Sequence, residues 1–194
     1  MRLGDETHHM LLRHRPPGID SQPRGAASDF QHLSESALAV LRWLNASQIE
    51  FILVGPVGEA IRGDKEASGP VAVVPAPYER NIERLCRGLL AEHARMRIEG
   101  EQETLPVRMN EEKLLRGGRW TLRCGAHDLD IEGCPRGGPR YQELLYEASR
   151  FALAGDLSVE VAGPADLEHY AHLRLTGSPP EIRILRNATD KNLA

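Results

Sequence analysis

The sequence is poor in aromatic residues, in lysine and in cysteine, and it contains no long hydrophobic run. Aromatic residues make up 5% of its 194 residues, so its core has to be built mainly from aliphatic side chains. Apolar clusters such as Phe51 to Val54 are the length of a strand, whereas a membrane-spanning helix needs about 20 apolar residues. The sequence therefore predicts no membrane-spanning segment.

The three cysteines, Cys86, Cys124 and Cys134, are an odd number at unpatterned spacings, which does not indicate a disulfide framework. Residues 1–10 contain no apolar segment of the kind that a secretory signal needs. Both observations predict a cytoplasmic protein.

The charge balance does not indicate a nucleic-acid partner. The chain carries 24 Lys plus Arg against 28 Asp plus Glu, a formal net charge of −4. Proteins that coat DNA or RNA are usually strongly basic, because contacts to phosphates supply most of their affinity. Only three of the basic residues are lysines, a bias that we attribute to genomic base composition.

The pattern along the chain predicts one folded domain between two irregular ends. Residues 1–29 combine proline, glycine and mixed charges with few apolar residues, which predicts a disordered N-terminal arm. The domain is predicted over residues 30–176, and residues 177–194 form a C-terminal tail with little apolar content.

Apolar periodicity and turn residues predict a mixed arrangement of helices and strands. The fold class is α/β (α+β), with a small central mixed sheet flanked by helices. Helices are predicted at 34–47, 57–62, 77–93, 139–149 and 164–173, and strands at 50–54, 71–74, 105–109, 120–124, 129–131 and 157–161. The proline in the strand at 105–109 predicts an edge position. The strands at 120–124 and 129–131 predict an antiparallel hairpin.

This order of elements resembles the minimal nucleotidyltransferase fold of the DNA polymerase beta superfamily. The likeness is to short bacterial members related to the AbiEii toxins and to aminoglycoside and lincosamide nucleotidyltransferases. Residues 51–63 (FILVGPVGEAIRG) are similar to the family's strand, glycine turn and short helix, and residues 120–131 are similar to the strand that donates a third carboxylate. Residues 159–167 resemble the start of its closing helix. The resemblance covers roughly residues 33–173.

The resemblance implies a nucleotide site and a metal site. The nucleotide-binding residues that it implies are Gly55, Gly58, Arg62, Lys65 and Ser68. It implies Asp130, as the third carboxylate, and Asp128 as catalytic residues, and Asp130 with Asp64 as the ligands of Mg²⁺ if the protein is active.

The sequence departs from the family where the paired aspartates should stand. In the family, two aspartates placed two residues apart on one strand bind the metals. Here those positions are occupied by Pro70 and Ala72, neither of which can bind a metal ion. Pro56 also stands in the glycine turn, where it removes a backbone donor.

We therefore expect a catalytically degenerate nucleotidyltransferase-like protein that acts as a binding or regulatory module. Its partner would be a nucleotide, another small-molecule ligand, an RNA or a protein, and the sequence identifies no certain cofactor for it. One alternative is an active Mg²⁺-dependent nucleotidyltransferase that transfers a nucleoside monophosphate to a small molecule, an RNA or a protein, with Asp130 and Asp128, Asp64 or Glu66 as unusual ligands. A further alternative is a structural partner in a toxin–antitoxin pair.

Two other clusters of polar residues are candidates for binding phosphate or zinc. Arg62, Lys65, Arg119 and Arg123 flank the predicted cleft, where they either bind phosphate or form part of the solvated surface. Cys124, His127, Asp128 and Asp130 contain the ligand types of a zinc site, for which the simpler alternative is the end of a hairpin.

Overall fold

A computed structural model describes seven stretches of the chain. They are residues 33–63, 69–98, 102–107, 110–115, 119–133, 139–153 and 157–176. The predicted arm (1–29) and tail (177–194) lie outside these residues.

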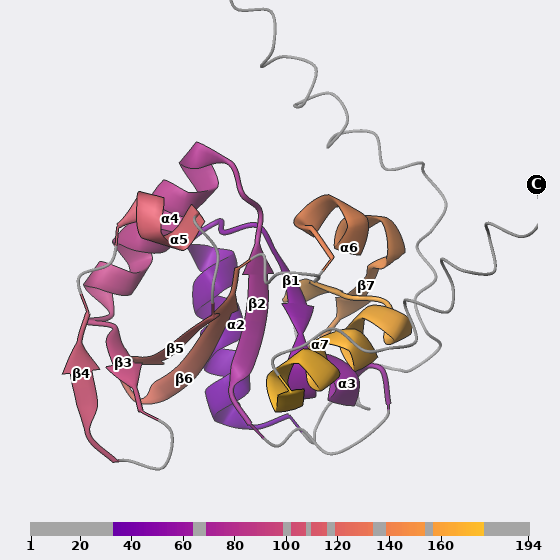
Figure 1. The fold of residues 1–194 in the computed structure, drawn as a ribbon, viewed down its shortest axis with the longest axis horizontal. Helices are drawn as coiled ribbons and strands as arrows, with labels where there is room; N and C mark the ends of the chain where they lie inside the picture. The colour runs from indigo at the N-terminus through magenta and orange to yellow at the C-terminus, as the bar shows by residue number, and fades with distance from the viewer. Residues whose placement is uncertain are drawn as a thin grey trace, which may run out of the picture.

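The sheet has eight strands in the order β4-β3-β5-β6-β2-β1-β8-β7 (Figure 1). The strands are β1 (Phe51–Val54), β2 (Val71–Pro75), β3 (Arg95–Arg97), β4 (Thr104–Pro106), β5 (Arg119–Cys124), β6 (His127–Glu132), β7 (Ser149–Ala152) and β8 (Ser158–Val161). Strand β2 pairs antiparallel with β1 and parallel with β6, so the sheet is mixed. The predicted fold class is confirmed, as are the edge position of β4 and the β5–β6 hairpin.

The sheet is larger than the sequence predicted, because β3 and β7 were not expected. Strand β7 begins at Ser149, where the preceding helix was predicted to end. Strand β3 consists of one methionine between two arginines and offers little hydrophobic signal.

Six helices accompany the sheet in the described residues. They are α2 (Glu35–Ala46), α3 (Gly55–Ile61), α4 (Glu79–Ala91), α5 (Glu111–Leu115), α6 (Tyr141–Glu147) and α7 (Pro164–Thr176). Helix α2 is capped by Ser34, whose hydroxyl accepts a hydrogen bond from the Ala37 N–H. Helix α4 begins at Glu79 instead of the predicted Pro77. None of the described helices is both long and apolar enough to cross a membrane.

The helices cover the two halves of the sheet from opposite sides. Helix α2 packs behind β2 and β6, whereas α3 and α7 contact each other and lie in front of β1 (Figure 1). No described helix lies in front of β3, β5 and β6 in this view. The front of these three strands is therefore the open face of the sheet.

Alternation along β6 gives its two faces different chemistry. Leu129 and Ile131 point into the core behind the sheet, and Asp128, Asp130 and Glu132 alternate with them on the open face. The neighbouring strand β5 repeats the pattern, with Leu122 and Cys124 in the core and Arg119, Thr121 and Arg123 on the open face. Charged side chains of both signs therefore meet on the open face.

Candidate functional site

Asp130 lies at the centre of the open face with an exposed fraction of 0%. On the adjacent strands it stands opposite Ala72 of β2 and Thr121 of β5. Its Oδ1 accepts a hydrogen bond from Nη2 of Arg97. Its Oδ2 accepts from Nη2 of Arg119 at 2.9 Å and from Nη2 of Arg174 at 3.3 Å. Both oxygens of this buried carboxylate are thus bound by guanidinium groups, which offsets the cost of burying its charge.

Glu132, two residues further along β6, binds two of the same arginines. Its Oε1 lies 3.1 Å from Nε and 3.0 Å from Nη2 of Arg174, and 3.4 Å from Nε of Arg119. Arg174 therefore spans both carboxylates from helix α7. These contacts attach the last turn of α7 to the open face of the sheet.

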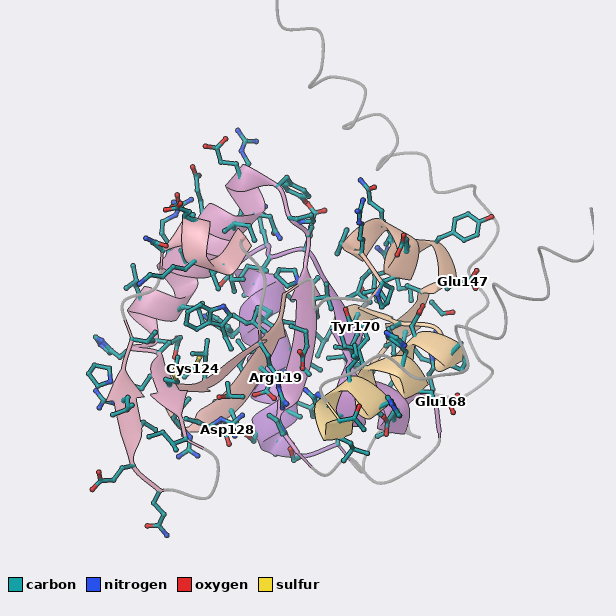
Figure 2. The ribbon with its side chains drawn as sticks, viewed as in Figure 1. Arg119, Cys124, Asp128, Glu147, Glu168 and Tyr170 are labelled. Carbon is teal, nitrogen blue, oxygen red and sulfur yellow. The ribbon has the colours of Figure 1, made fainter. Side chains whose placement is uncertain are left out.

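Asp128 lies two residues before Asp130 on the same face of β6, and its side chain is partly exposed to solvent. It lies 2.5 Å from Nε of Arg123 on β5 and 3.4 Å from Nη1 of Arg97 on β3. The hydrogen bond to Asp128 raises the pKa of Arg123, so its guanidinium remains charged. Figure 2 shows Arg119 and Asp128 over the β5–β6 pair.

We call these seven residues the arginine cluster. Its members are Arg97, Arg119, Arg123, Arg174, Asp128, Asp130 and Glu132. Four guanidinium groups face three carboxylates, which leaves a formal charge of +1. The side chains of Arg119 and Arg123 are 40% and 44% exposed, whereas that of Arg174 is only 14% exposed. The positive charge that solvent reaches is therefore concentrated on β5.

Gly55 connects β1 to α3 through a turn that Arg174 covers. Its φ of +69° is a conformation that residues with a side chain rarely adopt. A Cβ atom on Gly55 would lie 2.8 Å from Nη1 of Arg174 and 3.2 Å from the Cβ of Ala72. The guanidinium of Arg174 thus lies against the glycine turn, beside the strand position that the resemblance assigns to the second aspartate.

The other residues implied for the nucleotide site have different surroundings. A Cβ on Gly58 would lie 3.1 Å from Cδ2 of Leu167, so this glycine permits α3 to approach α7. Arg62 donates hydrogen bonds to the carbonyls of Val161 and Ala162 and lies over the ring of Phe151. The structure does not bring Arg62 into the arginine cluster. Asp64, Lys65, Glu66 and Ser68 lie outside the described residues.

The polar residues considered for zinc binding do not converge. Cys124 is buried among the core residues, and burial raises the pKa of its thiol to about 12. His127 Nδ1 forms a 2.9 Å hydrogen bond with Ser36, whereas Asp128 and Asp130 are on the open face. Within the described ranges, no three His, Cys, Asp or Glu side chains are grouped as metal ligands.

The sequence interpretation missed Arg97 and Arg174. Arg97 belongs to the unpredicted strand β3, and Arg174 lies beyond the predicted end of the last helix. The alternation Arg95-Met96-Arg97 was the available signal for β3, because it places both arginines on one face. Nothing local in the sequence indicated that Arg174 would reach Asp130.

Comparisons with known proteins found a likeness to solved structures. No family model matches the sequence. No curated protein matches it either. The fold is similar to the crystal structure of a presumed nucleotidyltransferase from Thermotoga maritima, which is 12% identical in sequence. The match covers 79% of this chain and 90% of that chain, with a TM-score of 0.46. A likeness this distant carries no argument about function.

Proposed function

We propose that this chain is a nucleotidyltransferase-like protein that transfers no nucleotide and instead binds a phosphate-bearing small molecule, such as a nucleotide, without a metal ion. The observation that carries the proposal is the pairing of Asp130 with Arg97, Arg119 and Arg174. The proposed role is binding or regulation, and the proposed site is the arginine cluster.

The pairing of Asp130 argues against metal-dependent transfer. Two-metal chemistry needs carboxylate oxygens that can coordinate the cations on both sides of the reacting phosphate. The resemblance places the other two ligands at Pro70 and Ala72, which have no carboxylate. A divalent cation approaching Asp130 would also meet three guanidinium charges, each of which repels it.

The exposed arginines of the cluster support binding of phosphate. A guanidinium is always charged, and its planar donors fit two oxygens of a phosphate group. Arg119 and Arg123 project from β5 on the open face, where no described helix covers them. The formal surplus of one positive charge makes the cluster attractive to an anion even while its internal ion pairs persist.

Calorimetric titration with ATP, GTP, CTP and UTP, in Mg²⁺ and in EDTA, tests the binding. We expect at least one nucleotide to bind with a Kd that EDTA changes by less than about twofold. The double variant Arg119→Ala/Arg123→Ala should weaken this binding at least about tenfold, since it removes two charged phosphate donors. Arg42→Ala is the matched control, because Arg42 is a half-exposed arginine on α2 outside the cluster.

Incubation with α-labelled nucleoside triphosphates tests the lack of transfer. We expect no labelled monophosphate on any acceptor above the level of the Asp130→Asn variant. Transfer that needs Mg²⁺ and disappears in Asp130→Asn would show that the active enzyme is the correct alternative. Absence of nucleotide binding, or binding unaffected by the double variant, would contradict the proposed site.

A further inference from the structure

A cavity lies at the other end of strand β1, away from the arginine cluster. Its volume is about 360 Å³. It is lined by residues from the end of α2, the starts of β1 and β8, helix α6 and strand β7: Asn45, Ile49, Glu50, Phe51, Tyr141, Leu145, Arg150, Ser158, Val159 and Glu160. Phe51 and Gly55 lie at opposite ends of β1, which separates this cavity from the glycine turn by about 13 Å at the rise of an extended strand. We call it the β1-start pocket.

The β1-start pocket has an apolar floor. Ile49, Phe51 and Val159 are buried beneath it, and Leu145 of α6 forms part of its wall. Its volume exceeds the 150 Å³ or so that encloses a benzene ring, so a small organic molecule of one ring and a short chain fits.

Carboxylates give the pocket its charge. Glu50 immediately precedes β1, and Glu160 lies within β8. Arg150 of β7 donates from Nε to Oε1 of Glu160 at 2.9 Å. Two carboxylates against one guanidinium leave a formal charge of −1. A ligand with one positive charge would neutralise it.

Tyr141 provides an observation that does not depend on the carboxylates. Its side chain is only 8% exposed and lines the pocket. Among the described residues, its hydroxyl has no hydrogen-bond partner. Burial raises the pKa of this hydroxyl, and the charges of Glu50 and Glu160 raise it further, so the group stays protonated and lies near both carboxylates. This unpaired hydroxyl of a pocket-lining side chain can form a hydrogen bond with a bound ligand.

We propose that the β1-start pocket binds a small organic monocation, an amine or a guanidine with an apolar body. The apolar body would pack on Phe51 and Val159, the cationic head would bind Glu50 and Glu160, and the Tyr141 hydroxyl would bond to the polar end of the ligand. This site is separate from the arginine cluster and holds or fails independently of the proposed function.

Matched pairs of compounds test the charge requirement. Phenethylamine, cyclohexylamine and N-butylguanidine are each titrated beside an uncharged counterpart of similar shape: 2-phenylethanol, cyclohexanol and N-butylurea. Calorimetry should give a Kd at least about tenfold lower for one or more of the cations than for its counterpart. If none of the three cations binds more tightly than its counterpart, the proposal is overturned.

Variants and chemical shifts locate the binding. Glu50→Gln and Glu160→Gln each keep the side-chain shape and remove a charge, and each should raise the Kd of the bound cation about tenfold. Tyr141→Phe should raise it several-fold without loss of stability, because no described residue bonds to that hydroxyl. Glu35→Gln is the control, since Glu35 is an exposed carboxylate on α2 outside the pocket.

In the unchanged protein, the bound cation should shift the amide resonances of residues 49–51 and 158–160. This measurement does not depend on whether a variant folds. Shifts confined to other residues, or an unchanged Kd in both folded Gln variants, would show that the cation binds elsewhere and would overturn the proposal.

Discussion

At the scale of single residues, Asp130 is the group on which the arginine cluster depends. Asp130→Asn removes one negative charge from a fully buried site and leaves three guanidinium groups without their shared partner. Breaking a buried ion pair from one side costs about 3–5 kcal/mol. We expect a loss of this size in the free energy of unfolding, measured by urea denaturation.

The matched control for this change is Asp128→Asn. Asp128 lies on the same strand and face and also binds two arginines, but solvent reaches it. Its substitution should cost about 1 kcal/mol or less, because exposed ion pairs contribute little. An Asp130→Asn variant as stable as the parent would mean that Asp130 does not hold the cluster together.

The two buried thiols predict a loss of stability in alkali. Burial raises the pKa of Cys86 to about 11 and that of Cys124 to about 12, from 9.0 in an exposed thiol. Below pH 9 both states keep their protons, so the pH has no effect through these groups. Above pH 9 the unfolded chain releases its thiol protons while the folded chain retains them, and the free energy of unfolding falls by up to about 1.4 kcal/mol per pH unit for each thiol.

Urea denaturation at pH 8, 9 and 10 measures this dependence. We expect Cys124→Ala to reduce the slope between pH 9 and 10, whatever its effect on stability at pH 8. The comparison uses the difference between parent and variant, because buried tyrosines such as Tyr141 also destabilise the fold in alkali. The same slope in both proteins would contradict the raised pKa of Cys124.

At the scale of elements, the turn between β1 and α3 depends on the missing side chain of Gly55. Gly55→Ala would strain a φ of +69° and press a methyl group against Arg174 and Ala72. Gly63 is the control, since its φ is +95° but no atom of the described residues lies within 4 Å of the place that its Cβ would occupy. We expect Gly63→Ala to cost about 1 kcal/mol of backbone strain and Gly55→Ala about 2–4 kcal/mol.

A double-mutant cycle separates the contact with Arg174 from the backbone strain. In an Arg174→Ala background, Gly55→Ala should cost less than in the parent, because the closest clashing atom is gone. The expected coupling is about 0.5–2 kcal/mol, measured by urea denaturation of the four proteins. Additive effects would place Arg174 away from the glycine turn.

The helices and strands also show which parts of the fold can be predicted from the sequence. Continuous apolar runs predicted β1 and β2, and helical periodicity predicted α2 and α4, because each signal lies within one short segment. The pairing of β2 with β6 depends on segments about 60 residues apart, and no local pattern contains that information. Strand β3 was not predicted because its two arginines lie on the open face, so the segment has no apolar run that would indicate a buried strand.

The same distinction applies to the candidate site. Gly55 and Asp130 were predicted, since each lies in a recognisable segment. Arg97 and Arg174 bind Asp130 from 33 and 44 residues away, and only the folded chain brings them together. The absence of aspartates at positions 70 and 72 was visible in the sequence. The guanidinium groups around Asp130 were not.

At the scale of the whole molecule, the pairing of Asp130 and Glu132 with arginines predicts a protein whose stability does not depend on divalent cations. A ligand that binds only the folded state stabilises it by RT ln(1 + [L]/Kd) and so raises the melting temperature. Because the carboxylates of the cluster already bind arginines, 10 mM MgCl₂ and 1 mM EDTA should give melting temperatures within about 1 °C of each other at equal ionic strength. Sodium pyrophosphate at a few millimolar should instead raise the melting temperature, and Arg119→Ala/Arg123→Ala should abolish most of that rise while Arg42→Ala preserves it. Stabilisation by Mg²⁺ that disappears in Asp130→Asn would show that Asp130 can exchange its arginines for a metal ion, and the alternative of an active nucleotidyltransferase would then be favoured.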